Sequence, residues 1–479
     1  MACKRIMAGV LASVMFVTVP VAVMKEQVDA SEGAVEINEE NFPDENFRKF
    51  IKKKFDSDKD GKFSASELKE IQSIDCSDQE DNPIRSVEGI EHLKYLVDLD
   101  CSCNEITSLD LSKNKKLLSL NCDFCEIGKI DIRKNTSLMF LSCMGCCLTT
   151  LDVSNNTKLK SIECDWNELT KLNLKNLPDL EKLTCESDHL ASINLSKNTK
   201  LRWLNVAGNE LTSLDLSKNT KLDELDCGRN QLTSIDLTNN TKLTKFICEG
   251  NQLTSLKLSK NKKLEKLVCN QNKFKSLNLK YNTQLYDLEC YGNPIKTIDI
   301  SNCPRLVAAY KCDDKPFKSD TDGYIDYDID SSVDTDLTIP SAAKVVTNKA
   351  TLKGWVDACG VYYYYTASHK IKKGWKKYNK KWYYLDPADG GAMAMDIRLI
   401  GKKVYLFNDS GAMKSNGWHK DSDGDWYYLK KSGAATTGWK KIKNKWYWFD
   451  KYGVMARSIK IKIKGKYYKF NKNGVCTNP

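Results

Sequence analysis

The chain has 479 residues, enough for two or three domains, and carries 74 Lys and Arg against 63 Asp and Glu. The net charge of +11 is a mild excess on a chain of this length, and no arginine-rich run concentrates it. Because a nucleic-acid-binding protein usually gathers its positive charge in one patch, this distribution argues against nucleic acid as a partner. An anionic surface such as a Gram-positive cell wall suits the same excess.

The first 30 residues have the features of a secretory signal. Lys4 and Arg5 form a positive start, an apolar run follows to Met24, and small or apolar residues lead to Ala30. We therefore expect a secreted protein, cleaved near Ala30. An uncleaved membrane anchor is the alternative, because the apolar run is about long enough to span a bilayer. No later run is long enough, so no further transmembrane anchor is expected.

Residues 31–89 predict a small helical unit. Asn41 and Pro43 have the residue types of a helix start, with Asn41 as the N-cap. Phenylalanines then recur at helical spacing up to an acidic stretch of 12 residues, Asp56–Glu67. Oxygen-bearing side chains stand at positions 1, 3, 5, 9 and 12 of this stretch, and Gly61 stands where a sharp turn requires positive φ.

This stretch resembles the calcium loop of an EF-hand. The resemblance implies that Ca²⁺ is held by six residues, the last of them bidentate and the fourth through its carbonyl: Asp56, Asp58, Asp60, Lys62, Ser64 and Glu67. An acidic helix–turn–helix without an ion is the alternative. Since calcium is abundant outside the cell, we expect a structural ion in a unit that covers the N-terminal end of the following repeats.

From Leu96 to Leu306 a leucine recurs every 21 residues, which is typical of a solenoid. The unit reads L-x-x-L-x-C-x-x-N-x-L-T-S-L-D-L-S-x-N-x-x. Apolar residues alternate in both halves of the unit, so we expect two short strands per coil, with Leu99 and Leu109 among the inward-pointing residues. The repeats resemble the 21-residue bacterial type of leucine-rich repeat, which implies a leucine-rich-repeat domain over residues 90–312.

A second repeated position carries asparagine. Asn104 and its equivalents, such as Asn167 and Asn209, are expected to form a hydrogen-bonded ladder inside the turns. Cys125 and Cys146 replace asparagine at this position, which predicts an interrupted ladder near the N-terminal end.

The 19 cysteines suggest disulfides at first sight, but their spacing indicates packing. Nine of them occupy one repeat position, where Val206 fills the remaining rung. A position that accepts valine is a buried apolar position. Stacked parallel strands also give a poor geometry for disulfides. We therefore expect free thiols.

One face of the repeat varies from unit to unit, whereas the outward residues of the second half are nearly constant. Such variation is typical of a recognition surface, although an unconstrained solvent face shows it too. Large side chains favour recognition of a protein or glycan. The candidate residues are Phe140, Met144, Glu163, Trp203 and Tyr291.

After the repeats, residues 313–353 read as an acidic linker, and residues 354–479 have a period of about 20 residues. Gly-Trp pairs begin at Gly354, Gly374, Gly417 and Gly438, each followed by a second aromatic cluster. Two further units lack the Gly-Trp pair. Each unit is expected to be a β-hairpin, and the hairpins are expected to stack into a second solenoid.

These units resemble the cell-wall-binding repeats of Gram-positive surface proteins, including choline-binding and glucan-binding modules. The resemblance implies aromatic boxes for a quaternary ammonium, each completed by a methionine such as Met393 or Met413. The residues that match are Trp375, Trp382 and Tyr405; Trp418, Trp426 and Tyr447; and Trp439, Trp446 and Tyr467. The same rings could stack on sugars, or could simply form the core of the hairpins.

No converging set of catalytic groups is visible, so a non-enzymatic protein is expected. The sequence predicts a mostly β fold with a leucine-rich-repeat solenoid, a helical EF-hand-like cap and a C-terminal hairpin solenoid. The function that fits is a secreted, wall-attached, adhesin-like binding protein whose hairpins hold teichoic acid, choline or glycan. A structural surface or biofilm component and an accessory wall-modifying enzyme remain the alternatives.

Overall fold

The computed structural model describes residues 34–77, 82–312, 337–340, 343–347, 353–358, 361–368 and 370–479. The expected signal, residues 1–30, and most of the expected linker lie outside these ranges. The described residues form two compact units: those up to Cys303 together with those between 337 and 347, and those from Pro304 to Cys312 together with those from 353 onward. Among the described residues, no helix combines the length and apolarity needed to cross a bilayer.

The first unit begins with the expected helical cap. Its elements are β1 (Val35–Glu36), α2 (Glu45–Phe55), β2 (Lys62–Phe63), α3 (Ala65–Glu70) and the 3₁₀ helix η2 (Ile90–His92). The helix α2 begins later than predicted, because the side chain of Asp44, not Asn41, accepts the N-cap hydrogen bond from Phe47 N at 2.8 Å. Buried phenylalanines, with Phe42 in edge contact with Phe47 and Phe63, form the core of the cap.

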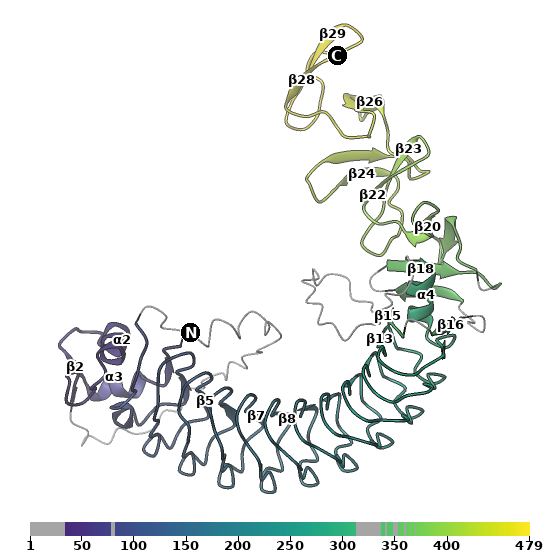
Figure 1. Cartoon of the computed structure of the whole chain (residues 1–479). Coiled ribbons are helices and arrows are strands. Elements are labelled where there is room, and N and C mark those ends of the chain that lie inside the picture. Colours follow the sequence, from purple (N-terminus) through teal and green to yellow (C-terminus); the bar gives the residue numbers. More distant parts are fainter. Residues whose placement is uncertain are drawn as a thin grey trace. The chain divides into compact units, whose positions relative to one another are not determined.

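Short parallel strands from successive repeats form one sheet, which is seen along the inner side of the arc in Figure 1. Each pairs with the next at an offset of 21 residues wherever both lie in the repeats, as in Leu225 with Phe246. The central residue of each strand is buried, as the period of two predicts. The strands are β3 (Ser73–Asp75), β4 (Asp98–Asp100), β5 (Ser119–Asn121), β6 (Phe140–Ser142), β7 (Ser161–Glu163), β8 (Lys182–Thr184), β9 (Trp203–Asn205), β10 (Glu224–Asp226), β11 (Lys245–Ile247), β12 (Lys266–Val268) and β13 (Asp287–Glu289).

The prediction of a second strand in every coil fails for most of the described repeats. Leu109 and Leu111 are buried as expected, but the second half of most coils is a series of turns, with one isolated parallel bridge between Asp110 and Asp131. The described repeat that starts at Leu285 does have a strand in its second half, β14 (Thr297–Asp299). The aspartate of the L-D-L-S pattern makes the first turn, since Asp215 Oδ1 accepts a hydrogen bond from Ser217 N at 2.9 Å. The nearly constant outward residues of this half therefore include turn-forming groups.

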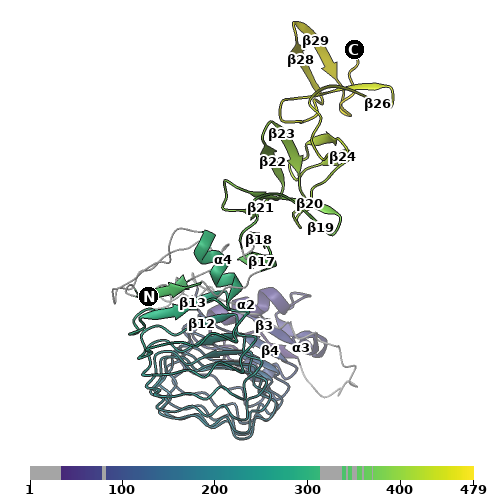
Figure 2. The same cartoon turned by 90° about the vertical axis from the view of Figure 1, so that its right-hand side faces the viewer.

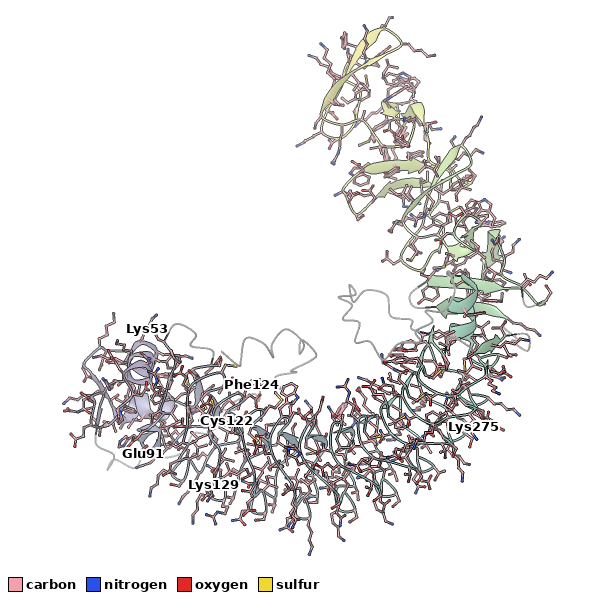
Figure 3. The ribbon with its side chains drawn as sticks, in the orientation of Figure 1. Lys53, Glu91, Cys122, Phe124, Lys129 and Lys275 are labelled. Atoms are coloured by element: carbon pink, nitrogen blue, oxygen red, sulfur yellow. The ribbon has the colours of Figure 1, made fainter. Side chains whose placement is uncertain are left out.

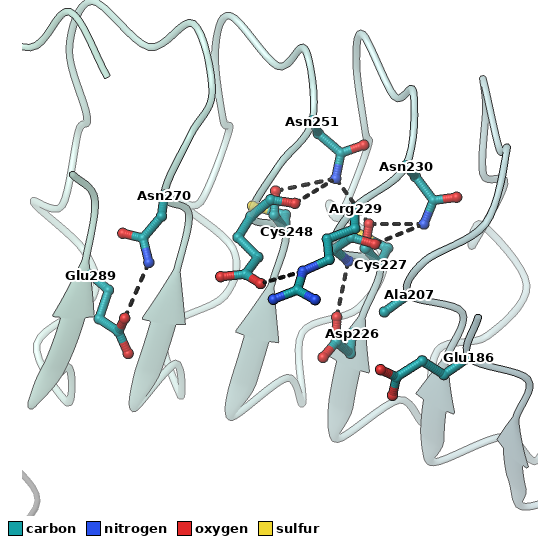
Figure 4. Close-up of polar contacts among 12 residues, drawn as sticks. Glu186, Ala207, Asp226, Cys227, Arg229, Asn230, Cys248, Asn251, Asn270 and Glu289 are labelled. Carbon is teal, nitrogen blue, oxygen red and sulfur yellow. Dashed lines mark hydrogen bonds and ion pairs between the residues drawn. The ribbon is translucent and has the colours of Figure 1, made fainter. Parts of the chain in front are cut away.

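The expected asparagine ladder is confirmed. Asn230 Nδ2 donates to the carbonyl of Val206 in the preceding coil at 2.9 Å and to Cys227 O at 3.2 Å, and its Oδ1 accepts from Leu211 N. Figure 4 shows this residue and its neighbour Asn251. The ladder is not interrupted at the two cysteines, because the Sγ atoms of Cys125 and Cys146 donate to carbonyls at the same offset of 24 residues.

A second asparagine ladder, which the sequence analysis did not predict, supports the other half of the coils. Its members are fully buried, and each Nδ2 donates to two carbonyls of the preceding coil, as Asn219 does to Leu195 O and Asn198 O. The members are Asn114, Asn135, Asn156, Asn198, Asn219, Asn240, Asn261 and Asn282. The side-chain amides of the two asparagine ladders therefore donate hydrogen bonds to backbone carbonyls in the turns of the coil. In a β-sheet, the backbone N–H groups of a neighbouring strand would donate these bonds.

The repeated cysteine position lies in the core, as predicted. The nine cysteines and Val206 all have 0% exposed side chains, and the described cysteines are free thiols. Burial raises the pKa of the Cys290 thiol to about 12. The position therefore works as a column of small apolar side chains.

Part of the predicted linker belongs to the repeat unit. The strand β15 (Leu337–Thr338) extends the long sheet beside β13, and β16 (Lys344–Val346) pairs in parallel with β14 (Thr297–Asp299). The strand β15 thus covers the C-terminal edge of the long sheet, because its backbone groups pair with the edge strand β13.

The second unit consists of α4 (Pro304–Cys312), which contacts β17, and six antiparallel hairpins, which follow one another in Figure 2. The predicted hairpins are confirmed, including the two without Gly-Trp. They are β17 (Gly354–Ala358) with β18 (Val361–Tyr365), β19 (Gly374–Tyr378) with β20 (Lys381–Asp386) and β21 (Ala392–Met393), β22 (Ile397–Ile400) with β23 (Lys403–Leu406), β24 (Gly417–Lys420) with β25 (Trp426–Leu429), β26 (Gly438–Ile442) with β27 (Lys445–Phe449), and β28 (Ile459–Ile463) with β29 (Lys466–Phe470).

Candidate functional site: aromatic boxes between hairpins

Successive hairpins are joined by backbone hydrogen bonds that bring aromatic rings together. The segment after β23 donates from Met413 N to Trp382 O of the preceding hairpin at 2.8 Å. The bond from Met455 N to Trp426 O and the bond from Cys476 N to Trp446 O repeat this arrangement. Each of these connections places the residue after one hairpin beside an exposed or half-buried tryptophan of the hairpin before it.

The first complete box surrounds a hollow of about 330 Å³, lined by Trp375, Trp382, Tyr405, Met413, Lys431 and Ser432. The rings of Trp375 and Trp382 are 6.4 Å apart and nearly perpendicular, at 87°. Tyr405 of the next hairpin lies 4.9 Å from Trp375. The three predicted aromatic residues are therefore brought together, and of the two predicted methionines Met413 is the one that lines the hollow.

The second box repeats this geometry. Trp418 lies 6.3 Å from Trp426 and 4.9 Å from Tyr447, all measured between ring centroids. Met455 takes the position that Met413 has in the first box, by the same backbone bond.

The third box requires a correction. Trp439 and Trp446 are 6.1 Å apart as expected, but the tyrosine against Trp439 is Tyr468, at 4.8 Å, and not Tyr467. Tyr467 points outward, with 56% of its surface exposed. The sequence contained the signal that was missed: the tyrosine of each box stands two residues before a phenylalanine, and Phe470 follows Tyr468 at that spacing. Because side chains alternate along a strand, an error of one residue reverses the face.

A fourth aromatic group, not predicted as a box, lies at the start of the unit. Trp355 contacts Tyr364 at 5.3 Å and Tyr383 of the following hairpin at 4.9 Å. Tyr378 also packs against Trp355, at 6.1 Å.

Between the third and fourth hairpins the corresponding space is filled. Val404, Tyr427 and Ala435 are buried in one cluster, and Ile397 packs against it. Ala435 N donates to Val404 O at 2.8 Å, the bond that joins Met413 to Trp382 in the first box. Small aliphatic groups therefore replace the tryptophan and methionine walls where the Gly-Trp pair is absent.

The acidic loop of the cap gathers three carboxylates. Ligand oxygens of Asp56, Asp58 and Asp60 lie within 4.8 Å of one another. Asp56 is buried, and its Oδ1 has no hydrogen-bond partner, while its Oδ2 accepts from Gly61 N at 3.2 Å. Three carboxylates and an unpartnered buried oxygen are a donor set that suits a hard cation such as Ca²⁺.

The other predicted ligands of this loop are placed differently. Both oxygens of Glu67 accept hydrogen bonds, Oε1 from Ser57 N and Oγ and Oε2 from Ser64 N and Oγ, at 2.7–2.9 Å. These bonds, first that from the Ser57 hydroxyl, lower the pKa of Glu67 to about 2. Lys62 lies in β2, paired with β1, and Ser64 caps α3. The ligand roles of Lys62, Ser64 and Glu67 stay predictions.

The predicted recognition residues lie on or beside the inner strands, as expected, but they are half-buried rather than fully exposed. The Arg202 guanidinium lies 4.5 Å from the Trp203 ring, and Glu163 pairs with Lys182 at 2.8 Å. Phe140 and Met144 share one coil, and Tyr291 N bonds to Asn270 Oδ1 at 3.1 Å.

Two aromatic residues of this face were missed because they stand one position beyond the alternating strand residues. Phe124 and Trp166 both have positive φ and lie two coils apart, with their rings 5.9 Å from each other. Gly145 of the coil between them leaves room, since a Cβ there would lie 2.8 Å from the Phe124 ring. Figure 3 shows Phe124 on the inner side of the arc and Lys129 on the outer side.

The inner face also carries buried and half-buried carboxylates. Desolvation raises the pKa of Asp123 to about 7 and that of Asp165 and Asp226 to about 6. Hydrogen bonds oppose this effect without cancelling it, for example those from the Ser142 hydroxyl and Met144 N to Asp123. Part of this face therefore exchanges protons near neutral pH.

The hairpin unit matches a known family. Residues 373–390, 416–435 and 437–455 match the putative cell wall binding repeat. These segments contain the tryptophan pairs of the first, second and third complete boxes. Comparison with curated protein sequences gave no match.

Solved structures are similar to one or other part of the chain. The functional domain of InlJ from Listeria monocytogenes, described as including a cysteine ladder, is 32% identical over 57% of this chain and 70% of its own, with a TM-score of 0.47. An internalin, inlF, from Listeria monocytogenes is 21% identical over 59% of this chain and 90% of its own, with a TM-score of 0.48.

Choline binding protein F from Streptococcus pneumoniae is 33% identical over 26% of this chain and 42% of its own, with a TM-score of 0.24. By its own geometry, the chain is a leucine-rich-repeat solenoid with a unit of β-hairpins, of which three match the putative cell wall binding repeat.

Proposed function

We propose that the protein is a secreted, wall-attached binding protein whose hairpin boxes hold quaternary ammonium groups of a wall polymer such as teichoic acid. The observation that supports this most strongly is the first box, where three aromatic rings and Met413 surround a hollow of about 330 Å³. A cation over several ring faces gains roughly 0.5–2 kcal/mol per ring without requiring a buried counter-charge. Several equivalent boxes on one chain would add avidity toward a repetitive polymer.

The test is sedimentation of the full chain with purified Gram-positive walls that carry choline. Replacing the exposed and half-buried box walls, with Trp382→Ala, Trp426→Ala and Trp446→Ala together, should leave most of the protein in the supernatant. Tyr452→Ala is a matched control, because Tyr452 is 53% exposed and outside the boxes. Free choline should compete with attachment. Undiminished sedimentation of the triple variant would contradict the proposal, and competition by sugars instead of choline would identify the boxes as glycan platforms.

The leucine-rich repeats would serve recognition in an adhesin-like manner. The half-buried aromatic residues on the inner face, including Phe124 and Trp166, support this role, because aromatic groups dominate binding energy at protein interfaces. The target is a protein or glycan. A pull-down with the intact chain and with the Phe124→Ala, Trp166→Ala double variant tests this role, since equal recovery of every partner would contradict it.

Calcium would stabilise the cap. Asp56, Asp58 and Asp60 would supply side-chain oxygens, with Lys62 O, Ser64 and Glu67 completing the set once Glu67 exchanges a bond from Ser57 for the ion. The ion would supply structural cross-linking of the loop. Calorimetric titration with CaCl₂ should show binding that Asp60→Asn weakens and that Glu45→Gln, on the exposed side of α2, leaves intact.

A further inference from the structure

The inner face of the leucine-rich repeats carries two half-buried aromatic rings, Phe124 and Trp166, which we call the aromatic pair. Their ring centroids are 5.9 Å apart and the rings are tilted by 32°, although they belong to coils two apart. The rings can approach each other because Gly145 occupies the coil between them, where a Cβ would lie 2.8 Å from the Phe124 ring. Among the described residues, no lysine or arginine stacks on either ring.

The carboxylates beside the aromatic pair are hydrogen-bonded to neutral groups. Asp123 accepts from the Ser142 hydroxyl at 2.7 Å, and Asp165 likewise accepts from a hydroxyl at 2.7 Å. Glu186 Oε2 accepts from the Asn205 amide at 2.8 Å. In the part of the chain that the structure describes, no lysine or arginine forms an ion pair with these three acids. Their negative charge therefore remains available to a partner.

Farther along the same face, cations of the chain itself neutralise most of the acids. Glu249 has the strand position of Glu186 three coils later, and it pairs with Arg229 at 3.2 Å, as Figure 4 shows. Lys266 likewise pairs with Asp287 at 2.6 Å. The charge that a partner could meet on this face therefore lies mainly beside the aromatic pair.

One coil of the same face shows how a ring and a carboxylate hold a guanidinium together. The Arg202 guanidinium is 4.5 Å from the Trp203 ring, and it donates to Asp223 Oδ2 from Nη2 at 2.6 Å and from Nε at 2.8 Å. This combination is favourable because a planar guanidinium stacks through its face and donates through its edge. The aromatic pair offers the same two kinds of group, since each of its rings directly follows an aspartate in the sequence.

We propose that the inner face over β5–β8 docks an arginine-bearing segment of a partner protein, with guanidinium groups stacked on the aromatic pair and hydrogen-bonded to the neighbouring carboxylates. This inference rests on the proposed recognition role of the repeats and names the chemistry of the partner. A polypeptide fits better than one small cation, because the acids from Asp100 beside β4 to Glu186 beside β8 extend over roughly 20 Å at the spacing of parallel strands. Lysine fits less well, since an ammonium group has no planar face to stack.

The test is the fluorescence anisotropy of three labelled peptides, titrated with the full chain. The peptides contain four repeats of Arg-Gly-Ser, of Lys-Gly-Ser or of Glu-Gly-Ser. At pH 8 the acids are charged, because the pKa of Asp123 is raised only to about 7 and that of Asp165 to about 6. The arginine peptide should bind, the lysine peptide should bind more weakly, and the glutamate peptide should not bind. Phe124→Ala with Trp166→Ala should raise the Kd for the arginine peptide roughly five- to thirtyfold. Glu186→Gln should raise it roughly two- to fivefold.

Matched variants separate this site from general effects of substitution. Glu249→Gln is the control for Glu186→Gln, because Glu249 has the same place in its coil but is already paired within the chain. Tyr281→Ala removes a 44% exposed ring that lies outside the inner strands. Both controls should leave the Kd unchanged. Phe124→Leu with Trp166→Leu keeps apolar side chains at the two half-buried positions and removes the ring faces, so it should weaken binding as the alanine variant does.

The outcomes distinguish this inference from the recognition role on which it rests. Equal Kd values for the native chain and both ring variants, or an arginine peptide that binds no more tightly than the lysine peptide, overturn the inference. If no peptide binds but the Phe124→Ala, Trp166→Ala variant still loses its partner in the pull-down, the inference falls and the recognition role stands. If no peptide binds and recovery is equal, both fall. Self-association of the native chain in sedimentation velocity, abolished by Glu186→Gln, would assign the face to a second copy and contradict a separate partner.

Discussion

Asp188 offers a test of how the repeats satisfy their backbone carbonyls. It occupies the position of the first asparagine ladder, and its Oδ1 accepts from Leu169 N at 3.0 Å, as Asn209 Oδ1 accepts from Leu190 N. Asn209 uses its Nδ2 to donate to Cys185 O at 2.8 Å. A carboxylate has no such donor, and Asp188 Oδ2 is buried without a partner. Desolvation, the largest cause, raises the pKa of Asp188 to about 7.

The sign of the effect on stability follows from linkage. The folded chain holds the Asp188 proton up to a pH of about 7, whereas an unfolded aspartate loses it near pH 4. Stability therefore falls as the pH rises from about 4 to about 7 and is then constant. Ionising Asp188 in the fold costs up to about 4 kcal/mol above that range. Asp188→Asn should thus stabilise the chain by about 2–4 kcal/mol at pH 8 and by less than about 1 kcal/mol at pH 4.

Urea unfolding of the native chain and of Asp188→Asn at both pH values measures the difference, in which the other buried acids largely cancel. The reciprocal variant Asn209→Asp should lose stability, most strongly at pH 8. Equal stability of Asp188→Asn and the native chain at pH 8, or an equal gain at both pH values, would refute the reasoning.

Further predictions concern the ladder, the thiols and the glycine spacing. Asn219→Ala, which leaves two buried carbonyls without their amide donor, should lower the free energy of unfolding by about 2–3 kcal/mol, and no loss would contradict a supporting role for the second ladder. Cys248→Val should change stability by less than about 1.5 kcal/mol, because Val206 already fills this position in another coil. With Ellman's reagent on the folded chain, Cys147, the exposed cysteine among those the structure describes, should react far faster than the buried thiols. Gly145→Ala should destabilise the chain by at least about 1 kcal/mol, through its φ of +62° and the Phe124 ring, which calorimetric melting would detect.

The repeat pattern alone predicted the solenoid, the buried cysteine column and the first asparagine ladder. It failed for the second strand, because alternation of Leu109 and Leu111 describes burial and not the partners of the backbone. In the second half of the coil, the backbone groups bond to the side chain of the turn aspartate and to the amide of a buried asparagine such as Asn219. A sequence pattern does not distinguish these side-chain hydrogen bonds from the backbone hydrogen bonds of a β-sheet.

The boxes show a similar division. Pairs within one hairpin, such as Trp375 with Trp382, followed from the spacing of the repeat. The tyrosine that the following hairpin contributes to a box had to be predicted from the offset between units. This offset identified Tyr405 correctly, but for the third box it gave Tyr467, whereas the structure has Tyr468. Lys431 comes from two hairpins away and had no sequence signal at all.

Direct titration of the full chain with choline, followed by tryptophan fluorescence, tests the central claim that the hairpin boxes bind quaternary ammonium groups. The account predicts a saturable change in the native chain and in Tyr452→Ala, and its loss when Trp382, Trp426 and Trp446 are replaced by alanine in a chain that still unfolds at the native temperature. A saturable change of the same size and midpoint in that triple variant would contradict it.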